Sequence, residues 1–435
     1  MLRHFYSFAL ILAVPFMLLR LVLKSLSLRA YRENIGQRFG KISLDGLPEA
    51  AAKDSPTIWI HAVSVGETVA AAPLVKALLE LTPRPVIVFT TTTPTGADRA
   101  RALFQDSVIH SYSPYDLGFV VRRFLSRVRP RLLIIMETEL WPNMLHYCQQ
   151  SGVRVLLANG RLSEKSAAGY AKIAGLTRRM LQQIDHIAVQ ADADAERFQA
   201  LGAPLGNMSV TGSLKFHTEG SYNEQPLPAL FQSIKEVGRP VIMAASTREG
   251  EEEKVLSGIK PLLQRPSAPL LLLVPRHPER FDKVEQLCLD KGLKVQRRSR
   301  TDVLSRDTQV LLGDSMGEML AYYSLADIAF VGGSLVDTGC QNVLEPAALA
   351  IPVVVGPSQY NFATICKQLE VAGALKTVLD SDAFSQVIGD LLDCEETRLA
   401  MGRAGRAVVD QNQQALPLLV KRISSLLAGQ VEFPQ

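Results

Sequence analysis

Cysteines are few in this sequence, and they are arranged neither as metal ligands nor as a disulfide framework. Five cysteines are scattered through 435 residues, with no Cys-x-x-Cys pair and no Cys/His spacing typical of zinc. An odd number of cysteines in a long chain without a cleavable signal fits a reducing compartment. We therefore exclude the disulfide-rich secreted class and expect no structural zinc.

Neither positive nor negative charge is in large excess over most of the chain. The formal net charge is only +4, and hydrophobic residues make up 47% of the sequence. Basic residues gather at the start, where residues 1–41 hold seven Lys or Arg against Glu33. A nucleic-acid binder spreads its basic field over a domain, so we expect no nucleic acid partner. Repeats are absent, and this length predicts two domains of roughly 150–200 residues.

One long apolar run occurs, from Phe5 to Leu23, interrupted by Pro15 and Arg20. Its length barely reaches the ~20 residues of a membrane-spanning helix. No cleavage site follows, and the basic cluster behind it favours a cytoplasmic location for the rest of the chain. We expect residues 1–30 to form a membrane anchor that spans the bilayer or lies in its interface, on anionic phospholipid. The alternative is a buried helix of a soluble domain.

Short apolar strands alternate with helical patterns over residues 31–212. The predicted strands are Thr57–Ile60, Val86–Thr90, Ser107–Ser111, Leu132–Met136, Val153–Ala158, His186–Gln190 and Ser209–Thr211. The predicted helices are Val69–Leu79, Gly96–Phe104, Leu117–Arg127, Trp141–Ser151 and Ala193–Leu201. Apolar strands without alternation, separated by helices, indicate a parallel sheet covered on both faces.

A loop-like composition, including Gly220–Pro228, interrupts this rhythm, so residues 213–239 are predicted to be an interdomain linker. A second domain over 240–415 has predicted strands at Val241–Ala245, Leu270–Val274, Val310–Leu312, Ile328–Val331 and Val353–Val355. Two doubly wound α/β domains in tandem predict a ligand site in the cleft between them. Residues 416–435 contain a predicted helix, about Leu416–Leu427, that packs back across that cleft.

The most informative motif is His61-Ala-Val-Ser-Val-Gly-Glu67, which lies between a predicted strand and a predicted helix. A glycine in a turn allows a ligand close to the backbone, and a carboxylate there can accept the proton of a substrate hydroxyl. The alternative for Glu67 is a helix start whose dipole favours negative charge. Taken alone, the motif favours this alternative, but similar strand-to-helix motifs recur along the chain.

Charged residues also follow later strands of the first domain. Leu132–Met136 runs into Glu137-Thr-Glu139, and extended structure would place both carboxylates on one face, where they can bind hydroxyls or stabilise positive charge. Pro142 predicts a helix start, so a solvated cap is the alternative, especially for Glu139. Lys215 follows the last strand and is placed to meet a phosphate or carboxylate, although a solvated lysine is the commoner outcome.

The second domain offers groups suited to a nucleotide. Pro275-Arg276 follows a buried strand, and arginine presents a fixed fork to phosphate or carboxylate. Glycine-rich turns at Gly313–Glu318 and Gly332-Gly333 indicate nucleotide-binding loops. Asn342-Val-Leu-Glu345 places a carboxylate where a ribose diol can bind, the alternative being a first-turn helix glutamate.

Other motifs have ready structural explanations. Thr90–Gly96 offers donors for an anion or sugar, and helix capping explains it equally well. Ser246 or Thr247 can cap a helix whose free N–H groups suit a phosphate, but nearby glutamates oppose an anion. Asp192-Ala-Asp194 has the form of a metal-binding DxD, yet capping explains it, so we expect no metal there.

In combination, these motifs closely resemble the 3-deoxy-D-manno-octulosonic acid (Kdo) transferases of lipopolysaccharide assembly, glycosyltransferases of the family 30 type. The resemblance runs from about Tyr31 to Leu427. The segments that carry it are His61–Glu67, Met136–Asn143, Asn159–Ser163, Gly212–Lys215, Pro275–Arg280, Gly313–Glu318 and Asn342–Glu345. Two stretches depart from the family pattern: Arg248 stands where a histidine is frequent, and Asp337–Gln341 replaces a Gly-His-containing loop.

The resemblance implies a GT-B fold and a metal-independent, inverting transfer of Kdo from CMP-Kdo to a lipid A precursor (lipid IVA) at the inner membrane, without a cofactor. It implies that Glu67 is the general base and that Glu137 and Lys215 stabilise the transition state. The CMP contacts that it implies are Pro275, Arg276, Met316, Gly317, Glu318, Asn342, Val343, Leu344 and Glu345.

Three rival functions stay open on the residues alone. The first is a UDP-sugar transferase of the same fold, which UDP rather than CMP would inhibit by competition. A nucleotide-sugar epimerase is disfavoured by the anchor. A non-catalytic membrane scaffold would not require Glu67, Glu137 and Arg276 to converge. No residue decides how many Kdo groups are transferred.

Overall fold

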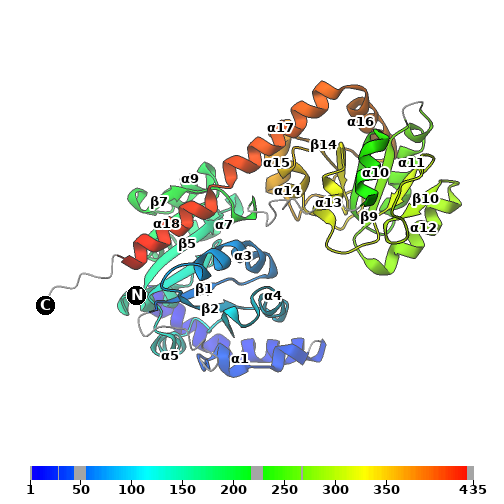
Figure 1. Ribbon diagram of the computed structural model, residues 1–435. Helices are drawn as coiled ribbons and strands as arrows, with labels where there is room; N and C mark the ends of the chain where they lie inside the picture. Colours follow the sequence, from blue (N-terminus) through cyan, green and yellow to red (C-terminus); the bar gives the residue numbers. More distant parts are fainter. Residues whose placement is uncertain (1, 28, 44–54, 217–228, 266–267, 429–435) are drawn as a thin grey trace. The chain divides into compact units, whose positions relative to one another are not determined.

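The computed structural model describes residues 2–27, 29–43, 55–216, 229–265 and 268–428. The chain divides into two compact units (Figure 1). Unit 1 combines Met1–His217 with Asn412–Gln435, and unit 2 is Thr218–Gln411. Of the linker expected over 213–239, residues 217–228 lie outside the described residues. Ala229–Val237 form helix α10, which buries Leu230, Phe231 and Ile234 in unit 2.

Each unit is built on one seven-stranded parallel sheet, which confirms the predicted doubly wound α/β class. The order is β3-β2-β1-β4-β5-β6-β7 in unit 1 and β10-β11-β9-β8-β12-β13-β14 in unit 2. The strands of unit 1 are β1 (Thr57–His61), β2 (Val86–Thr91), β3 (Ile109–Tyr112), β4 (Leu132–Met136), β5 (Arg154–Gly160), β6 (His186–Val189) and β7 (Met208–Val210). The strands of unit 2 are β8 (Val241–Thr247), β9 (Leu270–Pro275), β10 (Val295–Arg297), β11 (Val310–Leu312), β12 (Ile328–Val331), β13 (Val353–Val355) and β14 (Leu375–Thr377).

Helices cover both faces of each sheet. Those of unit 1 are α1 (Leu2–Ser27), α2 (Ile35–Arg38), α3 (Val65–Leu79), α4 (Pro94–Phe104), α5 (Gly118–Val128), α6 (Pro142–Gln150), α7 (Glu164–Ala171), α8 (Ala174–Leu181), α9 (Asp192–Ala200) and α18 (Ala415–Ala428). Those of unit 2 are α10, α11 (Glu251–Ile259), α12 (Phe281–Asp290), α13 (Met319–Tyr323), α14 (Leu344–Ala348), α15 (Ala363–Val371), α16 (Ser381–Asp393) and α17 (Glu395–Asn412). Among the short 3-10 helices, η4 (Leu214–Phe216) matters for the site.

The apolar strands are explained by burial on two sides. In β4, Leu133 and Ile135 face the core that α5, α6, α8 and α9 cover. Leu132, Ile134 and Met136 face the opposite core, which α3, α4 and α18 cover. Unit 2 repeats this pattern, with α11, α12 and α16 on one face of β9 and α10 and α13 on the other.

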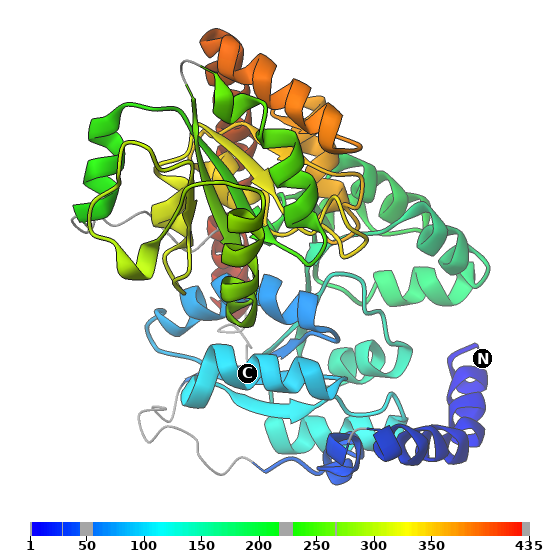
Figure 2. The same ribbon diagram turned by 90° about the vertical axis from the view of Figure 1, so that its right-hand side faces the viewer.

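The last helix, α18, completes one face of unit 1. Leu416, Leu419 and Ile423 are buried there, and the helix lies beside α3 and β5 (Figure 1). The first helix, α1, runs along the same unit (Figure 2). Its described side chains alternate between partly buried and exposed with a helical period, so one face of α1 contacts unit 1.

Candidate active site

The candidate site of unit 1 lies where the strand order reverses. β1 pairs with β4, and successive strands leave this pair in opposite directions. Ligands of open α/β sheets bind outside the carboxyl ends of the strands at such a point. The segment after β1 leads to Glu67 and the segment after β4 leads to Glu137, so both carboxylates lie at this edge.

A variant of the capping box, in which the carboxylate accepts the N–H of the residue before the N-cap, holds Glu67 at the start of α3. Ser64 is the N-cap, and its hydroxyl oxygen accepts the Glu67 N–H at 3.3 Å. The Glu67 carboxylate in turn accepts the Val63 N–H at 2.7 Å and the Ser64 hydroxyl at 3.0 Å. The helix begins at Val65, not at Val69 as predicted, because this box starts it earlier. Gly66 therefore lies in the first helical turn, and the expectation of a glycine loop was wrong.

The environment of Glu67 favours its protonated form. Glu67 is only 7% exposed, and burial is the main reason why its pKa rises to about 7. The neighbouring Glu139 and Glu137 carboxylates raise the pKa further, whereas the Val63 and Ser64 hydrogen bonds lower it. A carboxyl group with a pKa near the operating pH is suited to accept a proton in catalysis.

His61, the first residue of the same motif, has a structural environment. It is buried, and burial lowers its pKa to about 4, so the imidazole is neutral at pH 7. Its Nδ1 lies 3.0 Å from Thr90 Oγ1, which also accepts the Trp59 indole N–H at 2.8 Å. These contacts fix the end of β1 against β2.

Glu137 does not have the extended backbone that its spacing from Glu139 suggested. Its φ is +55°, in the left-handed region that residues other than glycine rarely adopt. Its N–H donates to the Ala158 carbonyl at 3.0 Å, and its carboxylate lies 3.5 Å from Lys215 Nζ. The turn after β4 thus aims Glu137 at Lys215, while Glu139 accepts the Trp141 indole N–H at 3.1 Å. The predicted helix start at Pro142 is confirmed.

Asn159 supports this pair, although no role for it was predicted. It is fully buried at the end of β5, with a φ of +56°. Its Oδ1 accepts the Leu214 N–H at 3.0 Å and so fixes η4, which carries Lys215. An asparagine before Gly160 at a strand end is the signal for such a left-handed position.

In unit 2, the predicted donor contacts form two groups. Arg276 is exposed directly after β9, and its positive charge lowers the pKa of Glu345, against the larger effect of burial, which raises it. Asn342 Nδ2 donates to Glu345 Oε1 at 3.0 Å, and Asn342 Oδ1 accepts the Leu344 N–H at 3.0 Å. Arg276, Asn342 and Glu345 therefore lie together, next to the buried Val343 and Leu344, which begin α14.

The second group follows β11. Glu318 is held by Arg298 at 3.1 Å and by the Ser315 hydroxyl. Met316 is 65% exposed, and Gly317 has a φ of +83°, which explains the need for glycine. The neighbouring turn thus presents an exposed apolar side chain and a carboxylate already paired with a guanidinium.

The loop after β12 is not open to a phosphate, which corrects the expectation for Gly332-Gly333. The buried Glu251 carboxylate accepts the N–H groups of Gly333, Ser334 and Leu335 at 2.7, 3.0 and 2.8 Å. It also accepts the Arg248 N–H at 3.1 Å, so neither strand-end turn offers these donors to a ligand. The helix cap expected from Ser246 or Thr247 is wrong as well, because Gly250 is the N-cap of α11.

The remaining motifs behave as structural elements. Thr93 caps α4, since its Oγ1 accepts the Gly96 N–H at 3.1 Å. Asp194 Oδ1 accepts the Leu162 N–H at 2.8 Å, which joins α9 to the turn after β5. Among the described residues, no group of three His, Cys, Asp or Glu side chains is arranged to hold a metal ion.

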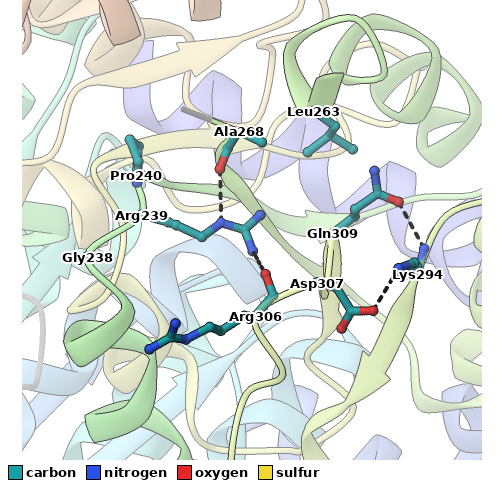
Figure 3. A pocket seen from close by; sticks show the side chains of 9 residues that line it. All are labelled: Gly238, Arg239, Pro240, Leu263, Ala268, Lys294, Arg306, Asp307 and Gln309. Atoms are coloured by element: carbon teal, nitrogen blue, oxygen red, sulfur yellow. Dashed lines mark hydrogen bonds and ion pairs between the residues drawn. The ribbon is translucent and has the colours of Figure 1, made fainter. Parts of the chain in front are cut away.

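A cavity of about 450 Å³ opens at the amino ends of β8 and β9 (Figure 3). Its most buried cation, Arg239, already donates to four backbone carbonyls at 2.7 to 3.2 Å. Lys294 is paired with Asp307 at 2.7 Å. The cavity lies at the end of the sheet opposite to the predicted donor residues, and its basic groups serve to join loops.

Comparisons with known proteins point in one direction. The family model described as 3-deoxy-D-manno-octulosonic-acid transferase (kdotransferase) matches residues 33–218, and glycosyl transferases group 1 matches residues 292–408. The 3-deoxy-D-manno-octulosonic acid transferase of Haemophilus influenzae is 40% identical over 432 residues, which cover 99% of this chain and 100% of the relative.

Two solved structures are similar to this chain. The UDP-GlcNAc 2-epimerase from Neisseria meningitidis bound to UDP-GlcNAc has a TM-score of 0.53 and 12% identity, over 85% of this chain and 100% of its own. The C-terminal CMP-Kdo binding domain of WaaA from Acinetobacter baumannii is 36% identical, with a TM-score of 0.36, over 42% of this chain and 98% of its own. The two parallel seven-stranded sheets, together with the similarity to the Neisseria meningitidis structure, show the GT-B fold class.

Proposed function

Because this chain belongs to the 3-deoxy-D-manno-octulosonic acid (Kdo) transferase family and is a glycosyltransferase that transfers Kdo, we propose that its donor is CMP-Kdo and its acceptor a lipid A precursor, lipid IVA. Glu67 is the general base of this proposal. The observation that carries it is the carboxyl group of Glu67, buried at the carboxyl edge of β1. Its pKa is raised to about 7, and the neighbouring Glu137 is paired with Lys215.

The reaction is a single displacement. The acceptor hydroxyl oxygen bonds to the anomeric carbon of Kdo while the bond from that carbon to the CMP phosphate oxygen breaks. The bonding electrons leave with CMP, and the hydroxyl proton passes to Glu67. Attack on the face opposite the leaving group inverts the anomeric configuration, through a transition state that resembles an oxocarbenium ion.

The charged groups around the reaction have complementary roles in this proposal. The Glu137 carboxylate stabilises positive charge that develops on the sugar ring, and Lys215 and Arg276 offset negative charge on the donor carboxylate or the leaving phosphate. Arg276, Asn342 and Glu345 lie together in unit 2, and we propose that they bind CMP with Pro275, Val343, Leu344 and the Met316–Glu318 turn. Fixed cations supply the charge that a metal would otherwise provide, so the proposed transfer needs none.

The first prediction is that the purified full-length protein transfers Kdo from CMP-Kdo to lipid IVA in the presence of EDTA. Mass spectrometry of the product then gives the number of Kdo groups added. CMP should inhibit the reaction, and UDP should not. A dependence on added divalent metal would contradict the proposed charge compensation, and no product despite CMP binding would reject lipid IVA as the acceptor.

We also propose that α1 attaches the protein to the membrane while lying in the interface. Arg3 and Ser7 near its start donate to Asn143 Oδ1 at 2.9 and 3.1 Å, and Ser25 near its end accepts the Arg32 Nε–H at 2.7 Å. The start of α1 is thus bound to α6, and its end runs on directly into the same folded unit, so both ends lie on one side of a hydrocarbon core of ~30 Å in this proposal. Its outward side chains are large and apolar, among them Phe5, Phe8, Leu12, Phe16, Leu19 and Leu23, which are all more than half exposed.

The second prediction is that the double variant Phe8→Asp, Phe16→Asp binds anionic phospholipid vesicles at least about 100-fold more weakly. These side chains are 60% and 73% exposed, and burying each stabilises binding by about 1.5–3 kcal/mol. Vesicle co-sedimentation measures the effect, with Phe8→Leu, Phe16→Leu as the matched control. An N-terminal tag protected inside sealed vesicles, with the catalytic units outside, would instead show that α1 spans the bilayer.

A further inference from the structure

A cavity of about 390 Å³ lies between α1 and the carboxyl edge of the sheet in unit 1. This volume is within the range of about 300–1,000 Å³ typical of small-molecule sites. Leu10, Met17 and Leu21 of α1 line one side, and Trp141 and Met144 line the other. The lining is mainly apolar, so the cavity is suited to a hydrocarbon chain.

One end of this cavity carries a buried cation. Arg38 is only 2% exposed, and its Nε and Nη2 are buried without a hydrogen-bond partner among the residues that the structure describes. Its guanidinium lies 4.2 Å from the centre of the Tyr112 ring, and burial lowers its pKa. A buried guanidinium with unused donors is costly unless an anion completes it.

The other charges around the cavity favour an anion too. Arg20 and Lys24 of α1 also line it, and both are exposed. Within the described lining the acidic residue is Asp116, whose carboxylate is occupied by the N–H groups of Asn143 and Met144 at 2.9 and 2.6 Å. Three cations therefore face the cavity without a free carboxylate to neutralise them.

Two lining residues of the cavity connect by hydrogen bonds to the segments that carry the candidate catalytic carboxylates. Thr92 lines it, and its N–H donates to the Val63 carbonyl at 3.3 Å, while the Val63 N–H donates to Glu67. Trp141 lines it and donates to Glu139. The cavity is therefore joined through Thr92 and Val63 to Glu67 and through Trp141 to Glu139.

We propose that this cavity is an acceptor subsite that holds one acyl chain of the phosphorylated lipid acceptor beneath α1, with a phosphate of the same molecule bound by Arg38. The inference rests on the proposed function for the identity of the acceptor. It assigns to α1 a part in substrate binding besides membrane attachment, since the helix forms one wall of the subsite.

Fluorescence tests the position of the chain directly, because the protein has two tryptophans. Trp141 lines the cavity and Trp59 is fully buried in the core. Lipid IVA with brominated acyl chains, added to the detergent-solubilised protein, should quench emission saturably. The Trp141→Phe variant should lose this quenching. Equal quenching in both proteins, or equal quenching of the wild type by brominated phosphatidylglycerol, would overturn the subsite.

Kinetics test the phosphate contact. Arg38→Met should raise KM for lipid IVA about ten- to hundredfold, because a charge-assisted contact is lost, and should leave CMP binding unchanged. Arg127→Met, an exposed position on α5, is the control for loss of one positive charge. An unchanged KM in a folded Arg38→Met protein would reject the contact. Transfer by the wild type without tryptophan quenching would reject the subsite alone, whereas quenching without transfer would reject the proposed reaction.

Discussion

Replacing Glu67 by glutamine is expected to lower kcat/KM for Kdo transfer by about 10²–10⁴-fold, because the proposed general base is removed. Glutamine keeps an oxygen that can accept the Val63 N–H at the start of α3, so the helix cap is preserved. The variant therefore separates chemistry from capping. Transfer is measured with purified protein, and CMP binding is measured by calorimetry.

The matched control is Glu80→Gln, an exposed glutamate at the other end of α3. It should keep wild-type transfer. If Glu67→Gln also keeps wild-type transfer while folded, the carboxylate is only a helix cap, and the base must be another group. If it loses CMP binding together with transfer, the result reports a wider disruption and the assignment of Glu67 as base loses its support.

The same assignment fixes the direction of the pH dependence. The base must be ionised, and the pKa of Glu67 is raised to about 7, chiefly by burial. kcat/KM should therefore rise with pH and level off above about 7. Glu139→Gln removes a negative neighbour that raises the pKa of Glu67. The inflection in the pH profile of this variant should therefore lie at lower pH than in the wild type. An inflection that stays in place or moves upward would contradict the electrostatic account.

The largest effect on stability is expected for Glu251→Ala. Its carboxylate accepts four backbone N–H groups, those of Arg248, Gly333, Ser334 and Leu335. Each buried donor left without a partner costs about 1–3 kcal/mol, so at least about 4 kcal/mol of the free energy of unfolding of unit 2 should be lost. That is a large share of the ~5–15 kcal/mol typical of a folded domain.

Urea unfolding of the full-length protein measures this loss, with Glu253→Ala as the control on the same helix. Glu253 is exposed, and an exposed substitution should change the free energy by no more than about 0.5 kcal/mol. Equal stability of the two variants would show that the N–H groups of the loop after β12 find other hydrogen-bond partners when Glu251 is removed.

The strands with the strongest apolar character could be predicted from the sequence to the residue, as for β4, β11, β12 and β13, because burial on both faces demands continuous apolar residues. The three-residue edge strands β10 and β14 escaped prediction. Each mixes polar residues with a single well-buried one, for example Arg297 and Leu375, and an edge strand is buried by fewer neighbours.

Of the candidate site, the residues could be predicted from the sequence, but their geometry could not. Glu67, Glu137 and Lys215 could be selected because each follows a strand. Their geometry depends on left-handed turns at Glu137 and Asn159, which spacing alone does not reveal. The role of Glu251 was equally hidden, since three of its four partners lie 82 to 84 residues further along the chain, where the sequence suggested an open phosphate loop.

The arrangement of the units has a consequence for biosynthesis. Unit 2 is one continuous segment inserted into unit 1, which recovers the chain only at Asn412. The helix that closes one apolar face of unit 1, α18, is therefore synthesised after the whole of unit 2. Domains generally fold as they are synthesised, so the inserted unit can fold while the first-made unit still lacks a wall of its core. The core of unit 1 is thus completed only after every residue of unit 2 has been made.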